Sequence, residues 1–498
     1  MGDTIHFGTD GWRAIIGEGF TDESLIRVSV AAAQAFKEGM HEQGTVQAPQ
    51  VAQAADGAAD GAAAPQAGQA PPTIIVGYDC RKDARRFAQL AAQVVAAQGF
   101  RVKLSHDYCP TPALCWSVAQ DDAALGGIML TSSHNPAEYL GVKLRMADGG
   151  ASPAGFTDRV ESLLEEGLPE GGPAGKRDDY EDIDLVGPYL EALKGSVDAD
   201  MIRAARLKVV VDPLYGAGRV YLAGLLESLG VEVFEINNAE DPTFDGLHPE
   251  PIPPWIDRGL AKARELACDA LFVTDGDADR IAAGDSQGNF VNPHRILTLL
   301  VAHLAQGRGQ TGRVVTTVTS SALLSRQCRR LGLDLTTTAV GFKWIYAEMA
   351  HGDVMIGGEE SGGIGIPSHV KERDGLLMAL LLAEAMAHRK MDLGALVDDM
   401  FESLGRLEFA RRGLSISETQ MARFCRETIP RLTPEAVCGK AVTGIDRSDG
   451  IKLSLEGDAW LMMRPSGTEP LVRIYAEAAT LEEVGQLLDT AEGIVAGG

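Results

Sequence analysis

Up to about residue 405, short runs rich in β-branched and apolar residues alternate with longer stretches of helical periodicity. Three blocks that start near residues 73, 207 and 313 begin alike, with an apolar strand, a turn and then a helix. Alternation of this kind is typical of α/β layers, in which helices cover the faces of a largely parallel sheet. The sequence therefore predicts an α/β fold with three related α/β mixed-sheet domains.

The chain changes character after about residue 405. Short alternating runs follow at 441–445, 451–455, 459–463 and 471–476, and a helical pattern extends from Leu481 to Val495. This tail predicts a smaller α+β domain at the C-terminal end. We expect four domains in all, over residues 1–185, 186–293, 294–404 and 405–498.

One segment of the first domain does not have the composition of a folded region. Residues 40–72 consist almost entirely of Ala, Gln, Gly and Pro and contain no aromatic residue. Such a stretch buries too little apolar surface to offset the entropy lost on ordering. We expect residues 40–72 to form a disordered loop insertion.

The charge balance restricts the classes of binding partner. The chain carries 70 acidic and 45 basic residues, a formal net charge of −25 at pH 7. Phosphate backbones and anionic lipid repel a protein this acidic, so we expect neither a nucleic acid nor a membrane as partner. An anionic small molecule would need a few concentrated cationic groups or a metal ion to overcome the overall field.

The sequence also lacks the signals of secretion and membrane insertion. The apolar stretch Leu376–Ala387 is too short to span a bilayer and contains Glu384. The N-terminus has no basic and apolar segments of a secretory signal. The seven cysteines form no CxxC pair, which favours reduced, buried thiols. We expect a cytoplasmic protein.

The segment TDGDADR (Thr274–Arg280) follows an apolar strand at 270–273. Its aspartates Asp275, Asp277 and Asp279 recur at every second residue, so an extended loop aims all three carboxylates in one direction. Three like charges require a cation, and hard oxygen ligands suit Mg²⁺ or Ca²⁺. An EF-hand is excluded because the sixth and twelfth loop positions are Arg280 and Ser286. The segment predicts a site for a divalent cation.

A second loop, TSSHNP (Thr131–Pro136), also follows an apolar strand, at 127–130. The Asn-Pro pair favours a turn, which places the serines beyond the end of the strand, where α/β sheets bind ligands. Neither Ser132 nor Ser133 stands in a GxSxG elbow, which argues against a serine hydrolase at this loop. Ten residues after Ser133, Lys143 is a candidate cation or acid/base group.

Three further segments suit a polar ligand. GGEESGG (Gly357–Gly363) combines glycines, which permit close approach, with carboxylates and a hydroxyl that bind a polyhydroxy compound. RPSGTEP (Arg464–Pro470) offers Arg464, Ser466 and Thr468 around Gly467 as a phosphate cradle. FGTDGWR (Phe7–Arg13) sets Arg13 beside a flexible loop.

Taken in order, these segments resemble the α-D-phosphohexomutase superfamily, in particular its phosphoglucomutase/phosphomannomutase members. The resemblance extends from FGTDGWR to RPSGTEP, apart from residues 40–72. It implies three related α/β domains and a mobile, phosphate-binding C-terminal domain around a central cleft. It also implies a sugar phosphate as the small-molecule partner.

The resemblance also implies roles for individual residues of this chain. Ser133 is implied to be the phosphorylated serine that donates its phosphoryl group to the sugar. One Mg²⁺ per chain is implied, held by the three aspartates and completed by the phosphate on Ser133. The other implied positions are Arg13, Arg280 and Lys143 beside the transferring phosphate, Lys343, Glu359 and Ser361 at the sugar, and Arg464, Ser466, Gly467 and Thr468 at the phosphate that does not react.

The implied activity is that of a phosphoglucomutase, an isomerase-type phosphotransferase. Such an enzyme interconverts α-D-glucose 1-phosphate and glucose 6-phosphate through a hexose 1,6-bisphosphate, which also serves as activator. The segment Gly341-Phe342-Lys343 resembles the substrate loop of phosphoglucomutases. Phosphomannomutase and phosphoglucosamine mutase activities are the alternatives with the same mechanism, and we expect a monomer or a weak homo-oligomer.

Two positions depart from the family pattern. Gly363 stands where members of dual glucose and mannose specificity carry histidine, which leaves Lys143 as the acid/base candidate and His134 as a second one. Ser132 stands where the family usually has Ala or Gly. Either serine could then carry the phosphate, and the residue directly before His-Asn, Ser133, is the preferred one.

Overall fold

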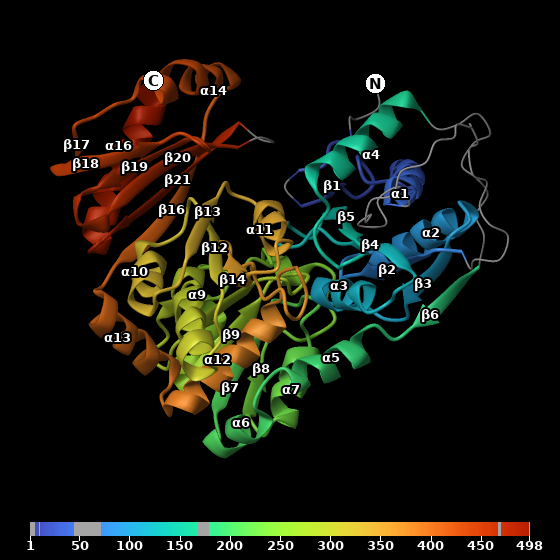
Figure 1. The fold of residues 1–498 in the computed structure, drawn as a ribbon, viewed down its shortest axis with the longest axis horizontal. Coiled ribbons are helices and arrows are strands. Elements are labelled where there is room, and N and C mark those ends of the chain that lie inside the picture. Colours follow the sequence, from blue (N-terminus) through green and yellow to red (C-terminus); the bar gives the residue numbers. More distant parts are fainter. Residues whose placement is uncertain (1–4, 9, 44–70, 168–178, 467–469, 498) are drawn as a thin grey trace, which may run out of the picture.

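The computed structural model describes residues 5–8, 10–43, 71–167, 179–466 and 470–497. Figure 1 shows three α/β units side by side and a fourth, C-terminal unit that lies next to the third, across from the helices of the first. The predicted α/β class, with three mixed-sheet domains and an α+β C-terminal domain, is confirmed.

Domain I is a mixed sheet in the order β1-β5-β4-β2-β3-β6. Its central strand β2 is buried on both faces, because Ile74 and Val76 pack with one apolar cluster and Ile75 with another. Alternation of side chains along a strand explains this division. The strands are β1 (Trp12–Ile15), β2 (Thr73–Tyr78), β3 (Arg101–Ser105), β4 (Ala124–Leu130), β5 (Tyr139–Met146) and β6 (Tyr180–Ile183), and the helices are α1 (Asp22–Gln43), α2 (Ala84–Ala97), α3 (Thr111–Ala119) and α4 (Ala154–Glu166).

Domain II has a sheet in the order β11-β10-β9-β7-β8, and the helices α5 (Val186–Gly195) and α6 (Ala199–Ala205) precede its first strand in the chain. Its strand β9 ends at the metal-binding segment predicted from the sequence. The strands are β7 (Lys208–Asp212), β8 (Glu232–Glu235), β9 (Ala270–Thr274), β10 (Ile281–Gly284) and β11 (Phe290–Val291); the helices are α7 (Tyr221–Ser228), η1 (Phe244–Gly246) and α8 (Asp257–Leu266).

Domain III has a sheet in the order β13-β12-β14-β15. The strands are β12 (Arg313–Thr317), β13 (Leu335–Thr338), β14 (Val354–Gly358) and β15 (Ile364–Gly365). The helices are α9 (Pro293–Ala302), the π-helical turn η2 (His303–Gly307), α10 (Ala322–Leu331), α11 (Phe342–Met349), α12 (Gly375–Arg389) and α13 (Leu393–Leu404).

The three α/β domains share one four-stranded arrangement. In each domain, one strand (β2, β7 or β12) lies between two parallel neighbours. One of these neighbours (β4, β9 or β14) also pairs antiparallel with the strand that follows it in the chain. The resulting orders are β3-β2-β4-β5, β8-β7-β9-β10 and β13-β12-β14-β15. This common order confirms that the three blocks recognised in the sequence are related.

Domain IV is an antiparallel sheet with the order β16-β21-β20-β19-β18-β17, covered by α16. It contacts domain III through an apolar cluster of Val318, Trp460, Met462 and Tyr475, and Lys452 Nζ donates to Val318 O over 2.6 Å. Its elements are β16 (Glu408–Ser415), α14 (Glu418–Arg423), η3 (Phe424–Thr428), α15 (Ile429–Arg431), β17 (Ala436–Val437), β18 (Lys440–Asp446), β19 (Ile451–Leu455), η4 (Glu456–Asp458), β20 (Trp460–Pro465), β21 (Leu471–Ala478) and α16 (Leu481–Gly497).

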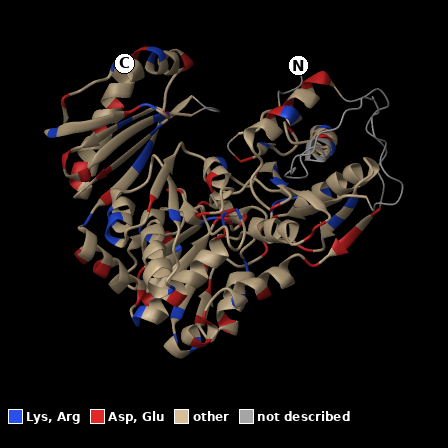
Figure 2. Cartoon of the chain, viewed as in Figure 1, with Lys and Arg blue, Asp and Glu red and all other residues tan. Residues whose placement is uncertain are grey.

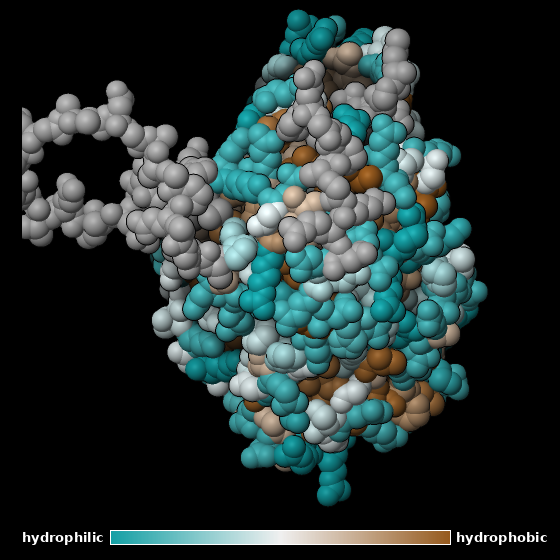
Figure 3. Space-filling view, turned by 90° about the vertical axis from the view of Figure 1, so that its right-hand side faces the viewer, coloured by the Kyte–Doolittle hydropathy of each residue, from teal (hydrophilic) through white to brown (hydrophobic). Residues whose placement is uncertain are grey.

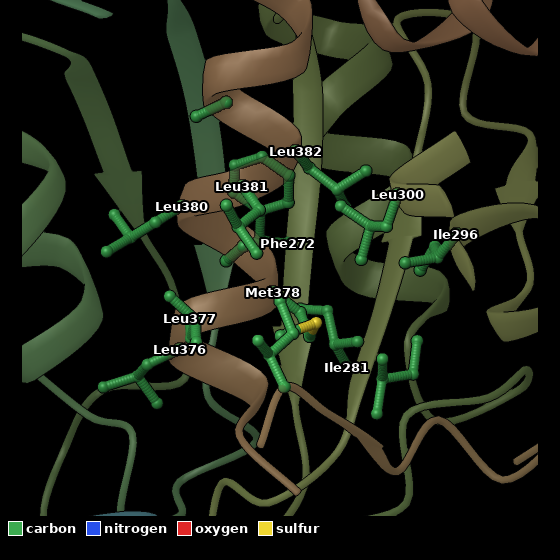
Figure 4. Packing of buried hydrophobic residues seen from close by; sticks show 14 of the residues in the cluster. Phe272, Ile281, Ile296, Leu300, Leu376, Leu377, Met378, Leu380, Leu381 and Leu382 are labelled. Atoms are coloured by element: carbon green, nitrogen blue, oxygen red, sulfur yellow. The ribbon is translucent and has the colours of Figure 1, made fainter. Parts of the chain in front are cut away.

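The apolar helix α12 is the centre of the largest core. Leu376, Leu380 and Leu382 are fully buried, and Figure 4 shows this helix packed against side chains of domains II and III such as Phe272 and Leu300. None of the described helices is long and apolar enough to cross a bilayer. The apolar stretch of the sequence is therefore a core helix.

Hydrophilic residues predominate on the molecular face shown in Figure 3.

Glu384 is a buried charged residue in the middle of the apolar helix α12. Its carboxylate accepts hydrogen bonds from His303 Nε2 at 3.0 Å, Arg308 Nε at 2.6 Å and the Asp198 N–H at 2.9 Å. Burial alone would raise the pKa of Glu384, but these hydrogen bonds outweigh it and lower the pKa to about 2. Glu384 therefore stabilises the folded state as a carboxylate above its unfolded pKa, and this contribution is lost as the pH falls toward 2.

Replacing Glu384 with Ala should destabilise the protein by about 3 kcal/mol at pH 7, because His303, the partly buried Arg308 and the Asp198 N–H lose the carboxylate that accepts their hydrogen bonds. Urea unfolding at pH 7 measures this difference, with the exposed Glu482→Ala as the control. The difference between wild type and E384A should shrink at pH 3. A constant difference between pH 7 and pH 3 would contradict the charge-based explanation.

One boundary differs from the sequence-based expectation. The insertion was expected to begin at residue 40, but α1 continues to Gln43. Met40, Glu42 and Gln43 are good helix formers, so the end of the helix extends past the change in composition. Residues 44–70 of the expected insertion, and the glycine-rich residues 168–178, lie outside the described residues.

Candidate active site

Three of the motifs occupy the same topological position in three domains. The β4–β5 connection carries Ser133, the β9–β10 connection carries Asp275, Asp277 and Asp279, and the β14–β15 connection carries Glu359. Because each connection follows the third strand of the shared arrangement, all three loops leave the carboxyl end of a parallel strand, where α/β sheets bind ligands. In Figure 2, acidic and basic residues meet in the middle of the molecule, where domains I to III adjoin.

Ser133 lies directly against the metal-binding loop. Its Oγ donates to Asp275 Oδ2 over 2.8 Å, and the imidazole Nδ1 of His134 lies 3.4 Å from Ser133 Oγ. The Oγ of Ser132 is buried and has no hydrogen-bond partner among the described residues. Of the two serines that the sequence left open, Ser133 is the one whose hydroxyl contacts the carboxylate cluster.

The three aspartates form one buried cluster, with ligand atoms within 4.8 Å of one another. Burial and the charges of Asp279 and Asp277 raise the pKa of Asp275 well above its usual value. For Asp277, burial also acts upward, but Lys143 outweighs it and the pKa is lowered. Within the described part of the chain, Asp277 Oδ1 and Asp279 Oδ1 are buried without a hydrogen-bond partner. Unpaired carboxylate oxygens at this spacing fit a hard divalent cation.

Lys143 is the principal cation of the site. Its Nζ contacts Asp277 Oδ2 and Asp279 Oδ2 at 2.8 Å and Asp10 Oδ2 at 2.9 Å. Burial acts to lower the pKa of this ammonium group, but the three carboxylates raise it above its usual value. Lys143 is therefore charged.

The two arginines implied by the resemblance also reach the serine loop and the metal loop. A guanidinium N–H of Arg13 donates to Asn135 Oδ1, beside Ser133. The Arg280 N–H donates to Asp275 Oδ1 at 3.0 Å, and its Nε lies 3.9 Å from Asp275 Oδ2. Burial, followed by the charges of Arg280 and Arg13, lowers the pKa of His134 well below its usual value, so its imidazole is neutral.

Four charged residues of the site were not recognised in the sequence. Asp10 pairs with Lys143, Arg145 and Arg373, and Arg145 Nε pairs with Glu372 Oε2 at 3.0 Å. Arg373 also contacts Asp279 Oδ2 at 2.8 Å. Glu372 and Arg373 stand in a charged run that resembles solvated surface, whereas Asp10 lies in a loop and Arg145 on strand β5. The ion pairs that bury these four residues form only in the tertiary fold.

Arg373 also explains why glycine is suited to position 363. A Cβ added to Gly363 would lie 2.2 Å from Arg373 Cδ, so a larger residue requires the arginine to move. The room that a histidine would need is therefore filled by the Arg373 side chain. The position of the Arg373 side chain thus explains why glycine, rather than histidine, fits at residue 363.

The loop of Glu359 faces the metal loop. Gly363 forms an isolated bridge with Arg280, and Glu359 Oε1 accepts from the Gly341 N–H at 3.0 Å. The Oγ of Ser361 has no partner among the described residues, which leaves it available to a ligand. Lys343 lines a small pocket together with Asp10 and Arg145. The predicted sugar-contacting residues therefore belong to the same region as the aspartates.

Domain IV contributes Arg464, whose Nε donates to Asp449 Oδ1 at 2.9 Å. The other oxygen of Asp449 accepts from the Val340 N–H at 2.9 Å, which ties this domain to the loop that precedes Lys343. The Ser466 N–H donates to Leu471 O at 2.8 Å. The predicted residues Gly467 and Thr468 lie outside the described residues.

Models of four domains of one family match the chain. They are described as phosphoglucomutase/phosphomannomutase alpha/beta/alpha domains I, II and III, over residues 39–169, 187–288 and 292–404, and the C-terminal domain, over residues 433–493. Together they cover most of the chain. The chain belongs to the phosphoglucomutase/phosphomannomutase family.

Individual members of the family are similar over the whole chain. The crystal structure of a putative phosphomannomutase from Thermus thermophilus is 34% identical with a TM-score of 0.82, and the match covers 99% of this chain and 100% of that one. A phosphoglucomutase/phosphomannomutase of Thermococcus kodakarensis is 28% identical over 97% of this chain and 96% of its own. A phosphoglucosamine mutase of Trichormus variabilis is 30% identical over 84% of this chain and 81% of its own. The family resemblance in the sequence is thereby confirmed, and this phosphohexomutase has similar identities to relatives named for different sugars.

Proposed function

We propose that the protein is a phosphoglucomutase that interconverts α-D-glucose 1-phosphate and glucose 6-phosphate through a phosphorylated Ser133 and a hexose 1,6-bisphosphate. The observation that carries this proposal is the 2.8 Å contact of Ser133 Oγ with Asp275 Oδ2 in a cluster that has unpaired carboxylate oxygens. A serine that contacts a divalent-cation site is suited to phosphoryl transfer.

Asp275, Asp277 and Asp279 would hold one Mg²⁺, with a phosphate on Ser133 completing the site. Bound Mg²⁺ would neutralise negative charge on the phosphoryl oxygens. Attack by a sugar hydroxyl oxygen breaks the P–Oγ bond of phosphoserine and forms a new P–O bond to the sugar. The hydroxyl gives its proton to a base, for which the neutral imidazole of His134 is the candidate, and Ser133 Oγ takes a proton from an acid. Lys143 is proposed as the acid, and His134, with its neutral imidazole near Oγ, as the second acid/base candidate.

The other predicted residues are proposed to hold the substrate. Arg13 and Arg280 would contact the phosphoryl group in transfer. Lys343, Glu359 and Ser361 would contact the sugar, and Arg464, Ser466, Gly467 and Thr468 would clamp the phosphate that does not react. Return of the phosphoryl group from the other sugar position requires the bisphosphate to turn over, which suits a clamp on a domain separate from the metal loop. The division of the chain after residues 185, 293 and 404 stays a prediction.

Initial rates with glucose 1-phosphate, mannose 1-phosphate and glucosamine 1-phosphate test the substrate assignment, each with Mg²⁺ and the matching 1,6-bisphosphate. We expect a clear preference for the glucose compound, supported by the Gly341-Phe342-Lys343 segment and by Gly363. A preference for the mannose or glucosamine compound would keep the mechanism and overturn the assignment of the sugar.

Glu359 should make substrate binding depend on pH near neutrality. Burial and the neighbouring charge of Glu360 raise the pKa of Glu359 to about 7. An ionised carboxylate accepts hydrogen bonds from sugar hydroxyls more strongly than a neutral one. We therefore expect the KM for glucose 1-phosphate to increase as the pH falls from 8 to 6, and Glu359→Gln to flatten this profile while raising the KM at pH 8. An unchanged profile in E359Q would assign the titration to another group or to the substrate.

A further inference from the structure

Arg81 is a fully buried arginine in the turn that follows β2, and its side chain is surrounded by the serine loop. It has 3% of its surface exposed. Every one of its guanidinium N–H donors has a partner: Nε donates to Asp79 Oδ2 at 3.2 Å, Nη1 to Pro136 O at 2.6 Å and Tyr139 O at 3.0 Å, and Nη2 to Ser133 O at 2.7 Å and Asn135 O at 2.6 Å. One side chain thus holds four carbonyl groups of the segment that contains Ser133.

The N–H side of Ser133 is fixed through the same pair of residues. The Ser133 N–H donates to Thr131 Oγ1 at 2.9 Å, and that hydroxyl donates to Asp79 Oδ2 at 2.6 Å. Asp79 is the carboxylate that accepts from Arg81 Nε. The two peptide groups that flank Ser133 are therefore anchored to one buried ion pair, one directly and one through Thr131.

Ser133 needs this support because of its backbone conformation. Its φ is +50°, in the left-handed region that a non-glycine residue rarely adopts without a surrounding structure to enforce it. On the other side of the loop, Gly276 packs so closely that an added Cβ would lie 2.3 Å from Ser133 O. The loop thus has little room to shift relative to the metal-binding segment.

We infer that Arg81 is a positioning residue for the reaction: it holds the peptide backbone of Ser133 so that Oγ faces Asp275 and the metal-binding segment. Lysine cannot replace it, because an ammonium group has three donors on one atom, whereas the planar guanidinium has five donors spread over three nitrogens. This inference rests on the proposed phosphoserine chemistry. It assigns Arg81 no contact with substrate.

The test compares Arg81→Lys and Arg81→Met with Arg86→Met, which removes an exposed arginine that pairs with Asp22. Displacing a reacting group by about 1 Å costs about 100-fold in rate, so we expect kcat to fall by about that factor in both Arg81 variants. The KM for glucose 1-phosphate should stay within about twofold, because the proposed sugar and phosphate contacts are untouched. Each rate is expressed per mole of phosphorylated Ser133, measured by mass spectrometry after incubation with the 1,6-bisphosphate.

A purely structural role would lower only the amount of folded protein, and kcat per phosphorylated Ser133 would equal that of the wild type. That result, or full activity of R81K, would overturn the inference. If neither Arg81 variant folds, Thr131→Val decides: it removes one hydroxyl from the same network, and an unchanged kcat in the folded variant would equally overturn it. A wild type that converts none of the three sugar phosphates would refute the proposed function instead.

Discussion

Ser133→Ala should bind no phosphate covalently and should lose turnover by about 10⁴-fold or more, since removal of a nucleophile that forms a covalent intermediate has effects of this size. The structure gives the reason for choosing this serine, because its hydroxyl contacts Asp275 within the carboxylate cluster. Incorporation of ³²P from labelled hexose 1,6-bisphosphate, followed by identification of the labelled peptide, measures the first effect. A coupled assay for glucose 6-phosphate measures the second.

Ser132→Ala is the matched control. It removes a buried hydroxyl one residue away that has no hydrogen-bond partner in the described part of the chain. We expect this variant to incorporate phosphate normally and to retain most of its activity. Normal turnover by S133A together with an inactive S132A would transfer the phosphoryl-carrying role to Ser132.

Asp275→Asn should abolish high-affinity binding of Mg²⁺ and lower kcat by about 10³-fold, because the amide supplies no negative charge to the cation. The same change should leave the melting temperature of the metal-free protein equal to or above that of the wild type. Burial and two neighbouring carboxylates disfavour the charge on Asp275, so its removal relieves repulsion in the absence of metal. The asparagine Oδ1 can still accept from the Arg280 N–H.

Isothermal titration with Mg²⁺ and thermal denaturation in EDTA separate these two effects. Asp212→Asn serves as the control, since Asp212 is a buried carboxylate of the same domain that pairs with Asn237 and lies outside the cluster. We expect D212N to bind Mg²⁺ with the affinity of the wild type. Wild-type affinity in D275N would show that the cation is held without this residue.

Most of the architecture could be predicted from local signals. The strand, turn and helix blocks and the motif at the end of each third strand are encoded in contiguous residues, so the sequence alone indicated three related domains and the loops that carry Ser133 and the aspartates. The resemblance to known mutases supplied the roles of these residues, which residue types alone left open. The smaller tail was equally visible from its alternating runs.

The buried ionic network could not be predicted in the same way. Arg81 and Arg373 lie in short polar segments that are typical of solvent-exposed turns, and Arg145 lies near the end of strand β5; the burial of all three depends on contacts with residues more than 50 positions away. Lys143 likewise resembles a solvated residue in the sequence, and only the fold shows that Asp10 and the metal-binding segment surround it. Charge pairing across domains is a tertiary property, and a single sequence contains no periodic signal for it.

The sharing of charges between domains has a consequence for synthesis of the chain on the ribosome. When only domain I has emerged, Lys143 and Arg145 have Asp10 as a partner, but Asp277, Asp279 and Glu372 are still to be translated. The reaction centre is therefore assembled late, when the third domain closes the ionic network. A nascent chain that stalls before residue 372 holds cationic side chains that lack part of their neutralising partners, and it should be a preferred substrate for chaperones and proteases.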